Sequence, residues 1–170
     1  WPAAVPIATG RTLQDYREIV RRFIADTGRA VRPHVTIETD QRGLLEVELL
    51  GPDAPLTVAN FLSLVDRRFF DGSAWHRVVP GFVVQDGDPR GDGWSGSGVP
   101  IRDEINRNRY DKPVLGMALS GPDTGTSQWF INLGPQPHLD GGYTVFGRVV
   151  GSQATLNRIM PGDVIRTIRR

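Results

Sequence analysis

The sequence predicts a mainly β fold: an eight-stranded closed antiparallel barrel capped by two helices, with an extra N-terminal helix. Short apolar runs of alternating period recur along most of the 170 residues, and turn residues separate them. Gly (20 residues) and Pro (13 residues) are both more frequent than average, which favours a turn-rich β fold over a helical bundle. Closure into a barrel removes the exposed sheet edges that many short strands would otherwise leave.

The first expected element is a helix over about residues 13–27. Its apolar residues recur at helical spacing. Thr12 with Asp15 resembles a capping box, and Gly28 suits the C-terminal end of the helix. The apolar stripe is too continuous to stay exposed, so we expect the helix to pack on the barrel. The alternative is that it joins the barrel to a further domain of a longer chain.

After Pro33 the apolar period changes to two, which indicates strands. A hairpin is predicted on residues 34–39 and 44–50. A second helix is expected to begin near Asp53-Ala54-Pro55, because proline is favoured in a first helical turn. Asp71-Gly72 ends that passage.

The rest of the chain alternates short strands with turns. Strands are predicted at about residues 75–79, 82–86, 99–104, 114–119, 127–133, 143–150 and 164–168. Ser152 can cap a short third helix that continues to Met160, before Pro161-Gly162. Two of the helices would then cover the open ends of the barrel.

Composition excludes several classes of function. The net charge of +1 argues against a dedicated nucleic-acid binder. The chain has no cysteine, which removes disulfides, thiolate nucleophiles and cysteine-based zinc sites. No apolar run approaches the ~20 residues of a membrane span. The bacterial cytoplasm and the cell envelope are both compatible with this composition. The beginning at Trp1-Pro2 resembles a cut edge, either a mature terminus or an excised domain.

Common catalytic patterns are absent from the sequence. None of the serines lies in a Gly-x-Ser-x-Gly motif. His34, His76 and His138 have no evident acidic partner, and no His/Asp/Glu set has metal-ligand spacing. The Gly-rich residues 91–98 do not lie between a strand and a helix, so we interpret them as a surface loop rather than a phosphate site.

The most informative segment is residues 75–88, where Arg77 interrupts an apolar, strand-like run. Phe82 follows five residues later and Gln85 eight residues later. A turn at Pro80-Gly81 can reverse the chain, so that a cation, an aromatic ring and an amide share one surface. Such a surface suits a neutral ligand with polar and apolar parts, such as a peptide.

Four segments match the motifs of one known family. They read PLTVANF (55–61), FDGSAWHRVVPGFVVQDGD (70–88), SQWFI (127–131) and LDGGYTVFGRV (139–149). Together they resemble the cyclophilin family of peptidyl-prolyl cis/trans isomerases, in its bacterial form. The resemblance covers about residues 34–169. It implies an isomerase domain over residues 34–170 and an N-terminal extension over residues 1–33.

The resemblance implies an enzyme that accelerates rotation about X–Pro bonds in proteins and so assists folding. It implies no cofactor and no metal, proline-containing polypeptides as partners, no nucleic acid, and a monomer. Arg77 matches the catalytic arginine of the family, and Gln85 can orient it. The residues expected to bind substrate are Phe82, Val83, Ala118, Leu119, Gln128, Phe130, His138, Leu139 and Tyr143.

Physical chemistry supports this assignment. Amide rotation is opposed by ~18–20 kcal/mol, because the nitrogen lone pair is shared with the carbonyl. The two X–Pro isomers are close in energy, yet they exchange slowly. A guanidinium can donate a hydrogen bond to the prolyl nitrogen, more strongly in the twisted transition state than in the ground state. Arginine keeps its charge at any working pH.

Four positions depart from the family pattern. Leu119 replaces a usual asparagine, and Tyr143 replaces a frequent histidine. Val83 is smaller than the common methionine, which predicts a slightly wider pocket. His138 stands where a tryptophan often contributes to cyclosporin binding, so we expect a reduced affinity for cyclosporin-type inhibitors.

Other interpretations of these residues stay open at this point. Phe82, Phe130 and Leu139 could be ordinary core residues, and Arg77 could form a structural salt bridge to Asp86 or Asp88. The chain could be a proline-binding folding helper or interaction module with weak catalysis. An oligonucleotide-binding barrel is the least favoured function, because it requires an exposed aromatic and basic face.

Overall fold

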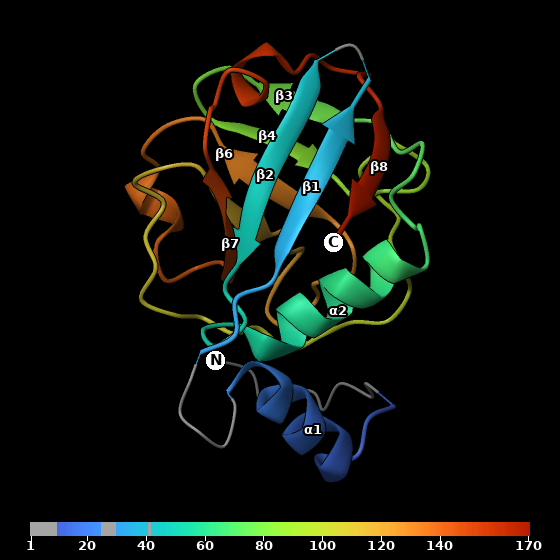
Figure 1. Cartoon of the computed structure of the whole chain (residues 1–170), viewed down its shortest axis with the longest axis vertical. Coiled ribbons are helices and arrows are strands. Elements are labelled where there is room, and N and C mark those ends of the chain that lie inside the picture. Colours follow the sequence, from blue (N-terminus) through green and yellow to red (C-terminus); the bar gives the residue numbers. More distant parts are fainter. Residues whose placement is uncertain (1–9, 25–29, 41) are drawn as a thin grey trace.

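The computed structural model describes residues 10–24, 30–40 and 42–170, and there eight strands form one curled antiparallel sheet (Figure 1). The strands are β1 (His34–Thr39), β2 (Gly43–Leu49), β3 (Arg77–Val79), β4 (Val83–Asp86), β5 (Val114–Met117), β6 (Trp129–Asn132), β7 (Val145–Val150) and β8 (Ile165–Arg169). Their order across the sheet is β3-β4-β6-β5-β7-β2-β1-β8. The mainly β class and the eight strands are therefore as predicted.

The predicted closure of the barrel is not confirmed. β3 and β8 are the two ends of the sheet order and do not pair with each other. Next to these ends, Ala74 makes an isolated bridge to Val164, and backbone hydrogen bonds such as Ile165 N to the Ser73 carbonyl lie around it. β3 has only three residues and pairs with β4 alone, so it supplies too little extended backbone to close the ladder. The sheet is curled and open.

Two further predictions are only partly met. Residues 99–104 do not form a strand: Ile101 makes one isolated bridge, to Gly125. Pro100 has no N–H to donate, which disfavours a ladder at this position. The expected third helix is reduced to a single turn of 3-10 helix, η2 (Leu156–Arg158). The other predicted strands and the first hairpin are present with small shifts of their ends.

The N-terminal helix α1 spans Leu13–Phe23 and begins with the expected capping box. Asp15 N donates to Thr12 Oγ1 at 3.3 Å, and Thr12 N donates to the Asp15 carboxylate at 2.5 Å. The helix ends earlier than residue 27, and the expected C-cap at Gly28 lies outside the described residues. Phe23 is buried in the main core, but Leu13 and Val20 are exposed, so the apolar stripe is only partly covered.

Helix α2 (Pro55–Asp66) begins with the predicted proline but is capped from a distant segment. Ala54 at the N-cap has no side chain that can cap the helix. Glu104 supplies the carboxylate instead, accepting from Leu56 N at 2.9 Å and from Thr57 N at 2.7 Å. A negative charge at this end also interacts favourably with the positive end of the helix dipole.

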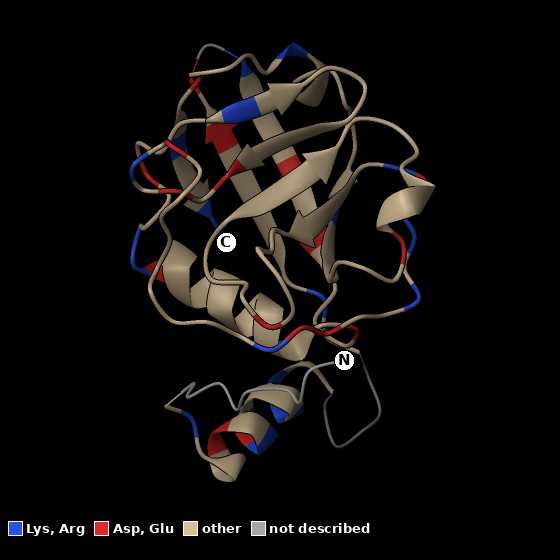
Figure 2. Cartoon of the chain, turned by 180° about the vertical axis from the view of Figure 1, so that it is seen from behind, with Lys and Arg blue, Asp and Glu red and all other residues tan. Residues whose placement is uncertain are grey.

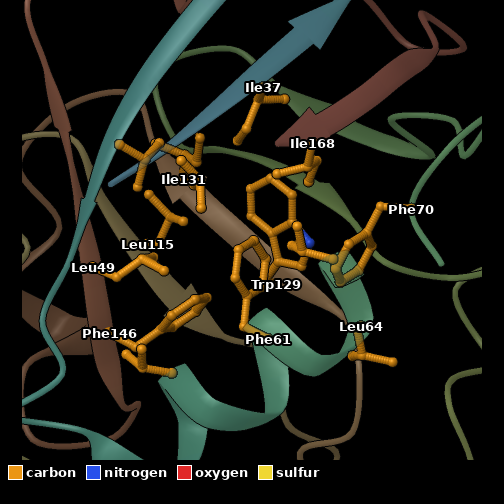
Figure 3. Packing of buried hydrophobic residues seen from close by; sticks show 14 of the residues in the cluster. Ile37, Leu49, Phe61, Leu64, Phe70, Leu115, Trp129, Ile131, Phe146 and Ile168 are labelled. Atoms are coloured by element: carbon orange, nitrogen blue, oxygen red, sulfur yellow. The ribbon is translucent and has the colours of Figure 1, made fainter. Parts of the chain in front are cut away.

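The main core lies between α2 and the concave face of the sheet (Figure 3). Trp129 lies at its centre, with the ring centroids of Trp75 and Phe61 at 5.2 and 5.7 Å. Phe130, the next residue on β6, belongs to a second and smaller cluster, because neighbouring strand residues point to opposite faces. We call this set the small core; it comprises Leu50, Val83, Tyr110, Val114, Phe130, Leu139 and Val145.

Charged residues are spread over the loops, the sheet surface and α1 (Figure 2). Both acidic and basic positions occur among these surface segments. Within the part of the chain that the structure describes, no helix is both long enough and apolar enough to cross a membrane.

Candidate active site

The site is built on the β3–β4 hairpin. The turn at Pro80-Gly81 reverses the chain, as expected, and Gly81 there has a φ of +71°, which glycine adopts without strain. The ladder register pairs Arg77 with Gln85, and Gln85 in turn with Phe130 on β6. Three side chains from three adjacent strands therefore lie side by side, which the spacing within β3 and β4 alone could only partly predict.

These strands border a pocket of about 190 Å³, here called the proline pocket after the ring that the resemblance found in the sequence implies for it. Its lining residues are Arg77, Phe82, Val83, Gln85, Ala118, Leu119, Phe130, Leu139 and Tyr143. All nine were singled out from the sequence. The other two predicted residues adjoin the pocket: Gln128 bonds to Gln85, and the ring of His138 stacks on that of Phe82 at 5.7 Å between centroids.

A chain of side-chain hydrogen bonds fixes the polar wall of the pocket. Arg77 Nη1 donates to Gln85 Oε1 at 3.2 Å, and Gln85 Nε2 donates to Gln128 Oε1 at 2.9 Å. Gln128 Nε2 donates to the carbonyl oxygens of Ser95 and Gly93, at 2.7 and 3.0 Å. Both amides are thereby oriented, and the oxygen of Gln85 faces the guanidinium.

The structural alternative for Arg77, a salt bridge to Asp86 or Asp88, is wrong. In the described part of the chain no ion pair involves Arg77. Asp86 is buried and accepts from Ser73 Oγ at 3.1 Å, while Asp88 accepts from Ser95. Arg77 is exposed and retains hydrogen-bonding capacity toward the pocket.

Aromatic rings shape the apolar part of the pocket. The Arg77 guanidinium carbon lies 5.3 Å from the ring centroid of Phe82, within the range of a cation–π contact. Phe130 meets Tyr143 edge-on and stacks on Tyr110, both at 5.7 Å between centroids. Tyr110 was not predicted from the sequence as a site residue, because it is buried behind the pocket and belongs to none of the matching motifs.

Gly116 explains how Tyr110 and Phe130 approach β5 so closely. A Cβ at this position would lie 2.4 Å from Phe130 Cζ and 2.4 Å from the Tyr110 hydroxyl. Its backbone φ is not in the left-handed region, so the requirement for glycine is one of space. The position was visible in the sequence, but nothing local to it indicated the contact.

A second hollow of about 480 Å³ adjoins the proline pocket. The two share Gln85, Ala118 and Leu119, and the wall of the second comes partly from residues 93–98. Residues 91–98 were expected to form only a surface loop. They are on the surface, but their carbonyls also hold Gln128, a role that no local pattern reveals.

Asp88 holds this loop in place. Its carboxylate accepts from the backbone N–H groups of Arg90, at 2.8 Å, and Gly93. Burial alone would raise the pKa of Asp88, but hydrogen bonds from Ser95, Arg90 and Gly93 outweigh burial and hold it well below the usual range. The carboxylate therefore stays charged and keeps the loop anchored at neutral pH.

The pocket offers no acid–base pair. Its ionisable lining residues are Arg77 and Tyr143. His76, next to Arg77 in sequence, is not among the lining residues, and burial lowers its pKa so that the imidazole is neutral. Among the residues that the structure describes, no three His, Asp or Glu side chains are grouped as metal ligands. The arrangement can hold an apolar ring and donate hydrogen bonds from a fixed cation.

Comparisons with known proteins agree with this geometry. The sequence model described as "Cyclophilin type peptidyl-prolyl cis-trans isomerase/CLD" matches residues 34–169. "Peptidyl-prolyl cis-trans isomerase B" of Bacillus subtilis is 45% identical over 127 residues, covering 74% of this chain and 89% of the relative. A peptidyl-prolyl cis-trans isomerase of Helicobacter pylori is 40% identical over 139 residues, covering 79% and 85%.

Solved structures give the same result. A crystal structure of a cyclophilin type peptidyl-prolyl cis-trans isomerase from Cryptosporidium parvum superposes with a TM-score of 0.77 at 32% identity. The superposition covers 81% of this chain and 96% of that one. The structure of the same protein in the presence of the dipeptide Ala-Pro gives a TM-score of 0.75 at 31% identity, covering 80% and 97%.

Proposed function

The chain belongs to the cyclophilin-type peptidyl-prolyl cis-trans isomerases, and we propose that Arg77 is the residue that catalyses rotation of the X–Pro bond. One observation carries this proposal. The Arg77 guanidinium is exposed at the mouth of an apolar pocket, has no ion pair within the described residues, and is held by Gln85. Because the fold leaves N–H groups of this guanidinium unused, they can donate hydrogen bonds to a ligand.

Arg77 acts as a hydrogen-bond donor to the prolyl nitrogen. In the planar amide this nitrogen is a poor acceptor, because its lone pair is delocalised into the carbonyl. When the bond twists, the nitrogen becomes pyramidal and recovers its lone pair. The guanidinium therefore binds the transition state more strongly than either planar isomer, which is the requirement for rate acceleration. No covalent bond is made or broken.

The remaining pocket residues hold the substrate while the bond rotates. Phe82, Val83, Phe130 and Leu139 contact the proline ring, and Tyr143 closes the edge of the pocket. The amide groups of Gln85 and Gln128 and the backbone near Ala118 and Leu119 bind the peptide on the polar side. His138 contributes through the Phe82 ring on which it stacks. The substrates are proline-containing polypeptides.

Replacement of Arg77 tests the assignment. In a protease-coupled assay on an Ala-Pro-Phe peptide, Arg77→Ala lowers kcat/KM about a hundred- to thousandfold, the usual cost of losing one transition-state donor. Arg77→Lys recovers little, because an ammonium lacks the planar fork. Arg102→Ala, at an exposed arginine outside both pockets, is the matched control and leaves the rate unchanged.

The same assay separates an enzyme from a proline-binding helper. If the unmodified chain binds the peptide but barely accelerates isomerisation, or if Arg77→Ala retains the full rate, Arg77 is not the catalytic residue. Peptide affinity measured in parallel shows whether the variant still holds the substrate.

The domain division belongs to the same proposal. Residues 34–170 form the isomerase domain, and residues 1–33 are an extension that packs on it through α1. Burial of Phe23 in the main core supports the packing role. We also propose that the domain acts as a monomer without a nucleic-acid partner, in keeping with its balanced charge.

A further inference from the structure

A basic pocket of about 230 Å³ lies away from the substrate site. Five cationic side chains line it: Arg32, Arg107, Arg109, Lys112 and Arg148. Asp111 is its only acidic lining residue. Five of the chain's 20 basic residues thus border one hollow, where like charges repel each other unless a counter-charge is present.

Two of the five cations form ion pairs with a single carboxylate, that of Glu48. Glu48, 8% exposed, pairs with Arg32 at 3.4 Å and with Arg148 at 2.5 Å. Burial alone would raise the pKa of Glu48, but the guanidiniums of Arg148 and Arg32 outweigh burial and hold it below the usual range. The Glu48 carboxylate thus orients both guanidiniums, and these three groups together keep a net positive charge.

The other three cations, Arg107, Arg109 and Lys112, have exposed side chains. In the described part of the chain none of the three takes part in an ion pair. By contrast, Arg42 and Arg166 elsewhere on the surface are paired with carboxylates. The basic pocket therefore keeps donors that the fold itself does not use.

The segment that carries Arg107 and Arg109 is anchored by the residues between and beside them. Asn106 Nδ2 donates to the carbonyl of Val145 at 2.8 Å, and Asn108 N donates to Asn106 Oδ1 at 3.2 Å. Tyr110 is buried in the small core, and its N–H donates to the Asp140 carboxylate at 2.9 Å. The two arginines thus project from a backbone that is already ordered, which lowers the entropy cost of binding a ligand.

From this arrangement we propose that the basic pocket binds a phosphate monoester. A phosphate monoester carries a charge of about −1.5 to −2 at pH 7 and three acceptor oxygens, which match several converging guanidinium and ammonium donors. A ligand with a single carboxylate has too few acceptor sites to bond with the three unpaired cations and with the two that Glu48 already pairs. A phosphorylated polypeptide and a small phosphorylated molecule both present this group, and the titration below distinguishes the two sources.

The basic pocket is distinct from the proline pocket, although both border the small core. Leu50 and Val114 line the basic pocket, whereas Phe130 and Leu139 line the proline pocket. The proposal does not depend on the role of Arg77. The loss of one site should therefore leave the other intact.

The test is an amide NMR titration of the full chain at pH 7.5, with ionic strength held constant by NaCl. The probes are inorganic phosphate, a phosphoserine peptide and the same peptide with glutamate in place of phosphoserine. The phosphoserine peptide is expected to give saturable shifts centred on residues 107–112, and inorganic phosphate tests whether the phosphate group alone is sufficient. The glutamate peptide should bind at least about tenfold more weakly, because it carries a single charge and fewer acceptors.

Variants decide whether the basic pocket is responsible. The double variant Arg107→Gln/Arg109→Gln should weaken phosphate binding at least about tenfold. Arg102→Gln/Arg169→Gln removes the same charge from exposed positions outside this pocket and should change affinity less than about twofold. If the first double variant folds poorly, Lys112→Gln, at an exposed side chain without an ion pair, replaces it with an expected loss of about threefold. The isomerase rate confirms the fold of each variant.

Three outcomes overturn the proposal. Shifts that are scattered or do not saturate show only non-specific attraction. Equal losses in the two double variants show that net charge, not the basic pocket, is responsible. Equal affinity for the phosphoserine and glutamate peptides shows that the site recognises a carboxylate. A response to the phosphoserine peptide alone supports a polypeptide source, and an equal response to inorganic phosphate supports a small-molecule source.

Discussion

At the scale of single residues, the position of Arg77 depends on two glutamines and two loop carbonyls. Gln85 accepts from Arg77, and Gln128 orients Gln85 through its own bonds to Ser95 and Gly93. We propose that Gln85 positions Arg77 and that its amide also contacts the peptide. Because each amide in the chain fixes the next, the whole series is sensitive to the loss of one member.

Replacing Gln85 should lower kcat more than it raises KM. Gln85→Leu removes the hydrogen-bond acceptor of Arg77. It should reduce kcat about tenfold, because the guanidinium is no longer held in one orientation. In the Arg77→Ala background the same change should cost little more, because the two residues act as one unit. Steady-state kinetics of the four proteins measure this coupling. Additive losses, with no coupling, would contradict a positioning role.

The stacked pair His138 and Phe82 underlies a prediction on inhibitor binding. An imidazole buries less apolar area than an indole, so the unmodified chain should bind cyclosporin weakly. His138→Trp should raise the affinity at least about tenfold, a gain of ~1.4 kcal/mol. Inhibition of the isomerase assay measures both constants, and the uninhibited rate of each protein serves as the control. Tight nanomolar inhibition of the unmodified chain would refute the prediction.

At the scale of elements, the N-terminal helix is attached mainly through Phe23, and a glycine makes room for it. A Cβ on Gly51 would lie 2.5 Å from Phe23 Cδ1. Ile19 is partly buried against the main core, whereas Leu13 and Val20 stay exposed. The helical period correctly predicted α1, but the period could not indicate which part of its apolar stripe would be covered.

Gly51→Ala tests this attachment. It should lower the free energy of unfolding by about 1–3 kcal/mol, the usual cost of overpacking. In a Phe23→Ala background the added methyl group meets no ring, so the cost should fall below about 1 kcal/mol. Urea denaturation measures both effects. Gly134→Ala, where a Cβ meets nothing within 4 Å, is the matched control. An equal cost in the two backgrounds would show that α1 does not rest on Gly51.

At the scale of the whole molecule, one buried carboxyl group makes stability depend on pH. Asp86 is fully buried on β4, and burial raises its pKa to about 7, against the lowering effect of bonds from Gly87 and Ser73. Its ordinary value is 3.8. Between these two values the folded chain holds a proton that the unfolded chain releases. Asp86 therefore favours folding most below the ordinary value, and its contribution falls as the pH rises toward 7.

Asp86→Asn should remove this component. Over roughly pH 4 to 7 the stability of the unmodified chain should fall relative to that of the variant, by at most about 1.4 kcal/mol for each pH unit. The comparison cancels the opposite effect of His76, whose lowered pKa favours folding as pH rises. Thermal unfolding between pH 4.5 and 7.5 measures the difference. Asp92→Asn, at a half-exposed carboxylate, is the control, and parallel curves for Asp86→Asn and the unmodified chain would refute the assignment.

The sequence by itself determined the fold class, most strands, both α-helices and all nine residues of the proline pocket. These follow from local signals: a period of two or 3.6, turn residues such as Pro80-Gly81, a capping box, and family motifs that lie in short continuous segments. Such patterns act between residues a few positions apart, so they can be read without the partner segments.

Tertiary structure alone decided the features that join distant segments. Glu104 caps a helix 47 residues earlier in the chain at Thr57, and the two ends of the sheet fail to close. Tyr110 supports Phe130 from behind, and the basic pocket draws cations from before β1, from residues 107–112 and from β7. These contacts depend on how the curled sheet brings its strands together in space. No local period or turn specifies that arrangement, because it is stabilised by side-chain packing and strand pairing between residues far apart in the sequence.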